Sequence, residues 1–235
     1  MKRLLIAALA PATAASLVLV APTSAHADAA VIGKITVKPG LAVQTAKSEQ
    51  KISLEVRATN AASMYASAEP TRGNGGALWF DLKETAKGSG IWRASDALSH
   101  YFAAGTWKVQ VVATDAEYDQ TTKGASFQVR RATYFAGFNA APSPVRRGKA
   151  ISVTGQLRGL NSYGMYVPFK GQKVTIYFKK KGTQKWVRYA VVTTAKNGKF
   201  AKRFSAKTSG WWIAGYAGNA TWYKSFSKND GVVVR

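Results

Sequence analysis

The stretch Ile151-Ser152-Val153-Thr154-Gly155-Gln156-Leu157 decides the fold, because apolar and polar side chains alternate along it. Ile151, Val153 and Leu157 share one face of an extended strand, and the polar residues between them share the other. Short strands of this kind, separated by turn residues, predict an all-β fold of antiparallel β-sandwiches. The same alternation recurs along residues 52–58, 107–113, 127–129 and 174–178.

Turn residues between these runs predict two hairpins. Asn197-Gly198, which lies between residues 191–193 and Phe200, is typical of a type I′ hairpin turn. The run Lys180-Lys181-Gly182-Thr183 predicts a second hairpin loop. No convincing amphipathic helix is found, although residues 61–68 could form a helical turn or two.

One predicted strand fits its pattern poorly. Phe200 and Phe204 share a face, but Lys202 lies between them on that face. Either a bulge changes the phase of the strand, or this is an edge strand whose inward lysine discourages further pairing.

The chain divides into three predicted segments. Residues 1–27 resemble a cleaved signal peptide, with a basic start, an apolar run and the cleavage pattern Ala25-His26-Ala27. Residues 28–132 and 133–235 are each long enough for one sandwich, which gives two tandem domains joined by a very short linker. The mature chain has no predicted transmembrane segment. It also has no cysteine, so its stability depends on apolar burial.

Several motifs of the second segment resemble a known family. Residues 144–157, 197–200, 210–212, 216–219 and 225–227 are similar to secreted bacterial Ig-like β-sandwich modules of Gram-positive envelope and extracellular proteins. The resemblance covers residues 134–235, and it is looser for residues 28–132. It implies two Ig-like sandwiches that serve as spacers or adhesive modules, and it implies no particular binding residues.

The charge of the two segments differs sharply. Residues 133–235 contain nineteen Lys and Arg but one carboxylate, Asp230, whereas residues 28–132 contain thirteen basic and ten acidic residues. Such an imbalance favours contact with polyanions. The candidate polyanion-binding residues surround the predicted hairpins and the strand that follows them: Lys179, Lys180, Lys181, Lys185, Lys196, Lys199 and Arg203. The alternative is that this charge only keeps the protein soluble.

Aromatic residues crowd into positions 211–226, and they form a second candidate surface. Trp211, Trp222 and Tyr223 are the candidates, because exposed rings can stack on sugars or bases. The alternative is that these rings fill the core of a domain without disulfides.

Catalytic and metal sites are poorly supported. His100 is the one histidine after residue 27, and the lack of cysteine removes Cys/His zinc sites and Cys–His nucleophiles. A Ser–His–Asp triad would need His100, and no G-x-S-x-G sequence accompanies it. Asp115, Glu117 and Asp119 are weak calcium candidates, because they supply too few oxygens and lack an EF-hand pattern. We therefore expect no enzyme activity, no favoured metal and no cofactor.

The sequence thus predicts a secreted, non-enzymatic binding or adhesive protein. Its expected partner is an anionic wall polymer or extracellular polysaccharide, and it could be retained non-covalently at the cell envelope. The alternatives are a spacer or protein-interaction module and aromatic-led carbohydrate binding. Export makes a nucleic-acid partner less natural without excluding it.

Overall fold

The computed structural model describes residues 28–46, 48–72 and 75–235. These residues form strands β1–β17 and no helix, which confirms the all-β prediction. Within this described part of the chain, no helix is long and apolar enough to cross a membrane. The predicted signal peptide and its cleavage pattern lie outside the described residues.

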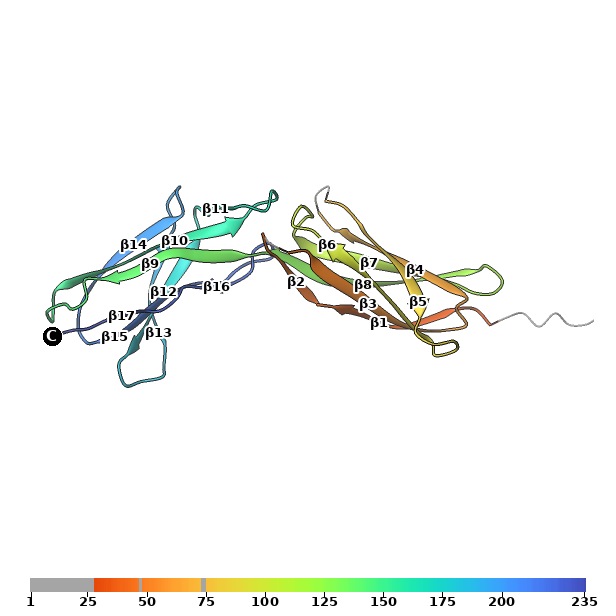
Figure 1. Ribbon diagram of the computed structural model, residues 1–235, viewed down its shortest axis with the longest axis horizontal. Helices are drawn as coiled ribbons and strands as arrows, with labels where there is room; N and C mark the ends of the chain where they lie inside the picture. The colour runs from red at the N-terminus through yellow and green to blue at the C-terminus, as the bar shows by residue number, and fades with distance from the viewer. Residues whose placement is uncertain (1–27, 47, 73–74) are drawn as a thin grey trace, which may run out of the picture.

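Eight strands before residue 132 form one sheet, in the order β1-β3-β6-β5-β4-β7-β8-β2 (Figure 1). All neighbours are antiparallel except β2, which runs parallel to β8. The strands are β1 (Val31–Lys38), β2 (Leu41–Gln44), β3 (Gln50–Thr59), β4 (Ser63–Pro70), β5 (Leu78–Glu84), β6 (Ile91–Leu98), β7 (Gly105–Thr114) and β8 (Gln120–Arg131).

This sheet turns over on itself at β5, which pairs with β4 through residues 78–82 and with β6 through Lys83 and Glu84. Away from β5, strands β8 and β1 are joined by a side chain. The Lys123 Nζ of β8 donates to the carbonyl oxygens of Ile32 (3.1 Å) and Gly33 (2.7 Å) of β1. The enclosed core contains the predicted apolar faces of β3 and β7, and the β7 face includes the fully buried Trp107.

The strands after residue 132 form two further sheets. In one, β10 pairs with β9 on one side and with β14 and β11 on the other; in the second, the order is β13-β12-β15, and β15 also pairs with β16 and β17. The strands are β9 (Thr133–Ala141), β10 (Ala150–Leu160), β11 (Tyr166–Pro168), β12 (Lys173–Lys180), β13 (Val187–Thr193), β14 (Lys199–Ser205), β15 (Gly210–Tyr216), β16 (Ser225–Phe226) and β17 (Asp230–Val232).

The two sheets enclose a core of their own. The predicted inner residues Val153 and Leu157 of β10 are fully buried, as are Val174 and Ile176 of β12. Trp212 of β15 stacks on Phe204 of β14, with ring centroids 5.0 Å apart. Aromatic rings therefore fill much of the space between the sheets.

Two local predictions are wrong. Residues 63–70 form strand β4 instead of a helical turn, because Met64, Ala66 and Ala68 alternate into the core between β5 and β7. Asn197-Gly198 does not close a hairpin, since β13 pairs with β12 and β14 pairs with β10. Of the two residues Asn197 and Gly198, only Gly198 has a positive φ, 73°. The Asn197 side chain accepts the Lys199 N–H at 3.0 Å, and the turn crosses from one sheet to the other.

The hairpin at Lys180–Thr183 is confirmed, because β12 and β13 pair up to Phe178 and Val187 on either side of it. The poorly fitting strand is β14, which pairs with β10 without a register shift. Lys202 lies opposite the buried Val153 and is itself exposed. The edge-strand alternative is therefore correct, and the bulge is not present.

A single residue, Ala132, separates β8 from β9. The Ala132 N–H donates to the Gln44 carbonyl (3.0 Å), and the Ala132 carbonyl accepts the Leu160 N–H (3.0 Å). The Arg131 N–H donates to the Thr221 carbonyl, and its carbonyl accepts the Tyr223 N–H, both at 2.9 Å. The backbone of this connection is thus hydrogen-bonded to Gln44 before the predicted boundary and to Leu160, Thr221 and Tyr223 after it. The two-domain division itself stays a prediction.

We predict that residues 133–235 fold as an isolated fragment, because among the described residues no sheet combines strands from both sides of residue 132, and each side has its own buried cluster. The fragment should give a β-type circular dichroism spectrum and a cooperative thermal transition. A fragment without such a transition would show that the two segments form one folding unit.

Candidate functional site

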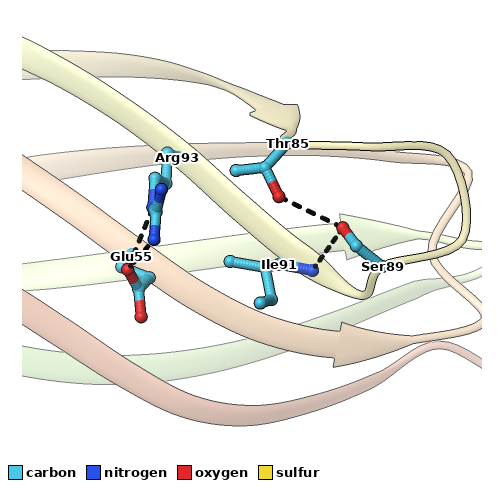
Figure 2. Close-up of polar contacts among 5 residues, drawn as sticks. All are labelled: Glu55, Thr85, Ser89, Ile91 and Arg93. Atoms are coloured by element: carbon cyan, nitrogen blue, oxygen red, sulfur yellow. Dashed lines mark hydrogen bonds and ion pairs between the residues drawn. The ribbon is translucent and has the colours of Figure 1, made fainter.

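Several carboxylates of residues 28–132 form ion pairs or hydrogen bonds within that segment. Figure 2 shows Glu55 of β3 and Arg93 of β6 reaching toward each other across neighbouring strands. The Arg93 Nε and Nη2 atoms both donate to Glu55 Oε2, at 2.9 and 2.7 Å. In the adjacent β5–β6 turn, the Ser89 hydroxyl lies 3.2 Å from that of Thr85 and accepts the Ile91 N–H at 3.3 Å.

Other carboxylates of this segment bind backbone N–H groups. Glu84 accepts from Gly88 (3.1 Å) and Gly90 (2.8 Å) in the same turn, and Asp96 accepts from Trp79 at 3.0 Å. Asp81 forms an ion pair with Lys83 at 2.8 Å. Several carboxylates of residues 28–132 therefore serve local structure.

Residues 133–235, all of which the structure describes, contain no such ion pair. Their one side-chain carboxylate, Asp230, lies opposite the buried Trp212, and its Oδ2 accepts the Ala140 N–H at 2.7 Å. The single acid of this segment is thus occupied by the backbone, and it neutralises none of the exposed lysines and arginines. A surface with unpaired positive charge follows.

Four chain segments bring exposed cations together at one end of these sheets. The Lys181 N–H donates to the Ser209 carbonyl (3.0 Å), the Gly148 N–H to Ala206 (2.8 Å), and the Arg147 N–H to Arg235 (2.8 Å). In Figure 1 this end, marked by the C-terminus, is remote from β1–β8. We call it the basic end, and its exposed residues are Arg146, Arg147, Lys149, Lys180, Lys181, Lys185, Lys207 and Arg235.

Sequence reasoning found only part of the basic end. Lys180, Lys181 and Lys185 were candidates, because they surround one hairpin. The other five cations come from the turn before β10, the turn before β15 and the C-terminal residues. Only the pairing of distant strands brings these segments together, so no local signal could have found them.

The remaining candidate cations are not part of the basic end. Lys196 and Lys199 flank the turn at the other end of β13, and Lys199 lines a shallow groove of about 640 Å³ with Phe200 and Gln156. Arg203 is exposed on the edge strand β14, opposite Ser152. With Lys179, described next, the candidate set is therefore spread over four places.

Lys179 occupies a different environment, on the outward face of β12. It lies opposite Trp211 of β15, and its Nζ atom is 5.1 Å from the centroid of the Trp211 ring. The same atom is 5.2 Å from the ring of Trp186, in the β12–β13 hairpin. Both distances are within the range of cation–π contacts. Trp186 was missed by sequence reasoning, because the phase of β13 depends on a bulge.

The other two aromatic candidates lie near the β8–β9 connection. Trp222 packs on Phe169, with centroids 4.4 Å apart, and its ring covers Gly159, so it belongs to the core cluster around Leu157. Tyr223 is half-buried, and its N–H binds the Arg131 carbonyl. Neither ring is therefore a freely exposed platform, and Trp222 fits the alternative that these rings fill the core.

The weak calcium candidates form a turn after β7. The Asp115 side chain is buried, and its Oδ1 accepts the N–H groups of Glu117 and Asp119, both at 2.9 Å. Across the described ranges, no group of three or more His, Asp or Glu side chains is placed to hold a metal ion. His100 lies in the turn after β6, with its ring 4.1 Å from that of Tyr101.

No protein-family model matches the chain. No curated protein sequence matches it either. Among solved structures, mouse CEACAM1b is similar over 86% of this chain and 100% of its own, at 12% identity and a TM-score of 0.45. A DUF4785 family protein of Legionella pneumophila is similar over 77% of this chain and 52% of its own, at 11% identity and a TM-score of 0.40. The D00-D0 domain of intimin is similar over 86% of this chain and 100% of its own, at 12% identity and a TM-score of 0.30.

All three similarities are below 25% identity and below a TM-score of 0.5. At such identities and scores they identify neither a ligand nor a source for this chain. The Gram-positive envelope origin that the sequence resemblance implies stays a prediction.

The Glu55–Arg93 pair predicts a pH dependence of stability. The hydrogen bond from Arg93 holds the pKa of Glu55 below that of an ordinary glutamate. A lowered pKa contributes stability above the unfolded-state pKa, and this is lost as pH falls through the folded-state pKa. Arg93→Gln should therefore lower the melting temperature slightly at neutral pH, and the difference from wild type should shrink on acidification.

The effect should be small, because both side chains are partly exposed and water screens the pair. Thermal unfolding between neutral and acidic pH measures it, with Arg203→Gln as a control that removes a cation without a carboxylate partner. A difference from wild type that does not vary with pH would contradict the assignment.

Proposed function

We propose that this chain is a secreted, non-enzymatic binding protein whose residues 133–235 associate with an anionic polymer of the cell envelope or extracellular space. The observation that carries the proposal is the basic end, where eight exposed cationic side chains meet without an acidic side chain of their own segment. Clustered charge of one sign raises the local concentration of polyanions and speeds their association.

The contrast between the two segments supports this assignment. In residues 28–132 several acidic groups bind cations or backbone N–H groups, so their charge is accounted for by structure. In residues 133–235 the cations are exposed and the one acid is occupied. A chain that needed charge only for solubility could carry acids and bases on both segments.

Reversing the hairpin charge tests the proposal. The triple variant Lys180→Glu, Lys181→Glu, Lys185→Glu should fold normally, because surface changes usually shift stability by less than about 0.5 kcal/mol each. Its retention on immobilised polyphosphate and on purified anionic wall polymer should fall strongly. The salt dependence of binding should flatten, because fewer counterions are released.

The matched control is Lys34→Glu, Lys51→Glu, Lys87→Glu, which changes net charge equally on exposed positions of residues 28–132. This control should retain most of the binding. If wild type binds neither polymer, the proposed function is wrong. If both triple variants lose binding equally, only net charge matters and the basic end is not the contact.

A spacer function is the second candidate, and the paired connection at Arg131 and Ala132 favours it. Gln44 strengthens that connection, because its buried Nε2 donates to the carbonyls of Ser99 and Phe102, both at 2.9 Å. A connection of one residue, bound on both sides, should restrict the angle between the two segments.

Small-angle X-ray scattering measures this restriction. The wild-type chain 28–235 should give a narrow distribution of maximum dimensions, and a variant with Gly-Ser-Gly-Ser inserted between Ala132 and Thr133 should give a broad one. Equal breadth in both proteins would rule out a fixed spacer.

A further inference from the structure

The outward face of the sheet β13-β12-β15 combines aromatic rings with cations. Rows across the sheet place Trp186, Lys179 and Trp211 side by side, and then Arg188 beside Tyr177. Phe226 of β16 lies opposite Gly215 of β15 and is 59% exposed. We call this surface the indole–lysine face, and its members are Tyr177, Lys179, Trp186, Arg188, Trp211 and Phe226.

A bulge in β13 creates this face. Ile176 lies opposite Ala190, but Tyr177 lies opposite Arg188, so Tyr189 is an extra residue. Tyr189 points toward the core side and is 41% exposed, with its ring 5.0 Å from both Phe204 and Trp212. Arg188 and Trp186 consequently join the outward rows. Without the bulge, the phase of β13 would place different residues beside Lys179.

One glycine lets two of these rings lie close to the sheet. A Cβ atom on Gly215 would lie 2.7 Å from Phe226 Cε1 and 3.1 Å from Tyr177 Cε2, so both rings extend over this glycine. Gly231 of β17 lies under Trp211, but a Cβ atom there would be 3.5 Å from Trp211 Cδ1 and Nε1, an ordinary contact distance. Glycine within a strand often marks a place where another group approaches closely.

Lys179 adds a fixed positive charge to this apolar surface. Its ammonium lies over both indole rings, and no carboxylate of residues 133–235 is available to neutralise it. A ligand that satisfies the whole face therefore needs flat apolar ring faces and a negative group between them. Sugars with carboxylates supply both, because one side of a pyranose ring is rich in C–H groups.

We propose that the indole–lysine face binds acidic polysaccharides of the uronic acid type. Sugar rings pack on Trp186 and Trp211, and the uronate carboxylate contacts Lys179. This inference rests on the proposed association with an anionic polymer, and it names the chemical class of that polymer. The basic end supplies long-range attraction at the adjoining hairpin tip, and the face supplies the preference for sugar over other polyanions.

Binding of three polymers to chain 28–235 tests the inference. Polygalacturonate has rings and charge, polyphosphate has charge without rings, and dextran has rings without charge. Isothermal titration calorimetry at one fixed ionic strength compares wild type with Trp186→Ala, Trp211→Ala and the double variant. Trp79→Ala is the matched control, because Trp79 is a 65% exposed tryptophan of β5 in the other segment.

We expect each indole substitution to weaken polygalacturonate binding about tenfold, the order expected for one aromatic stacking contact. Polyphosphate binding should be unchanged, and Trp79→Ala should behave as wild type. Trp186→Phe and Trp211→Phe should keep most of the binding, because they retain a ring. Lys179→Gln should reduce polygalacturonate binding more than Lys181→Gln does. Thermal unfolding confirms that each variant is folded.

The outcomes separate this inference from the proposed function. Wild type that binds neither polyanion would overturn both. Wild type that binds both polyanions, with indole variants unchanged or weakened equally on both, would overturn the indole–lysine face and leave the proposed function intact. Tighter, tryptophan-dependent binding to a single-stranded DNA oligonucleotide than to polygalacturonate would overturn the sugar assignment in favour of nucleic acid.

Discussion

Burial of apolar side chains between facing strands is the interaction on which the rest of this structure depends. The chain has no cysteine, so no covalent link supports the cores. Trp107 and Phe127 in the first core, and Trp212 in the second, supply large buried areas instead. Because strand residues alternate between faces, filling the interior with one set leaves every second position free to carry charge, hydroxyl groups or exposed rings.

That alternation explains how much the sequence could predict. The buried faces of β3, β7, β10 and β12 follow directly from their period of two, and the hairpin at Lys180–Thr183 follows from its turn residues. The failures have identifiable causes. Asn197-Gly198 has the composition of a hairpin turn, but pairing with β10 draws β14 into the opposite sheet. Residues 63–70 contain small side chains that read equally well as helix until the neighbouring strands are known.

The candidate site was less predictable, because surfaces are assembled from distant segments. Arg147 and Arg235 are neighbours through a backbone hydrogen bond, although 88 positions separate their numbers. Trp186 stands beside Lys179 only because one strand bulges. For Trp222 the sequence left open a surface and a core position, and the missing side chain of Gly159 leaves space that its ring fills. The composition thus indicated a surface with cations and aromatic rings, and the pairing of the strands determined which residues belong to it.

The connection between β8 and β9 has a further consequence for a protein exposed to proteases. Most proteases bind their substrates as extended backbone and need free N–H and carbonyl groups to do so. At Arg131 and Ala132 all four of these groups are already bound by Gln44, Leu160, Thr221 and Tyr223. The segment that joins the two halves is therefore a poor site for cleavage. Exposed loop tips such as residues 181–185 are the places where nicking would begin, and such a nick would leave the two halves connected.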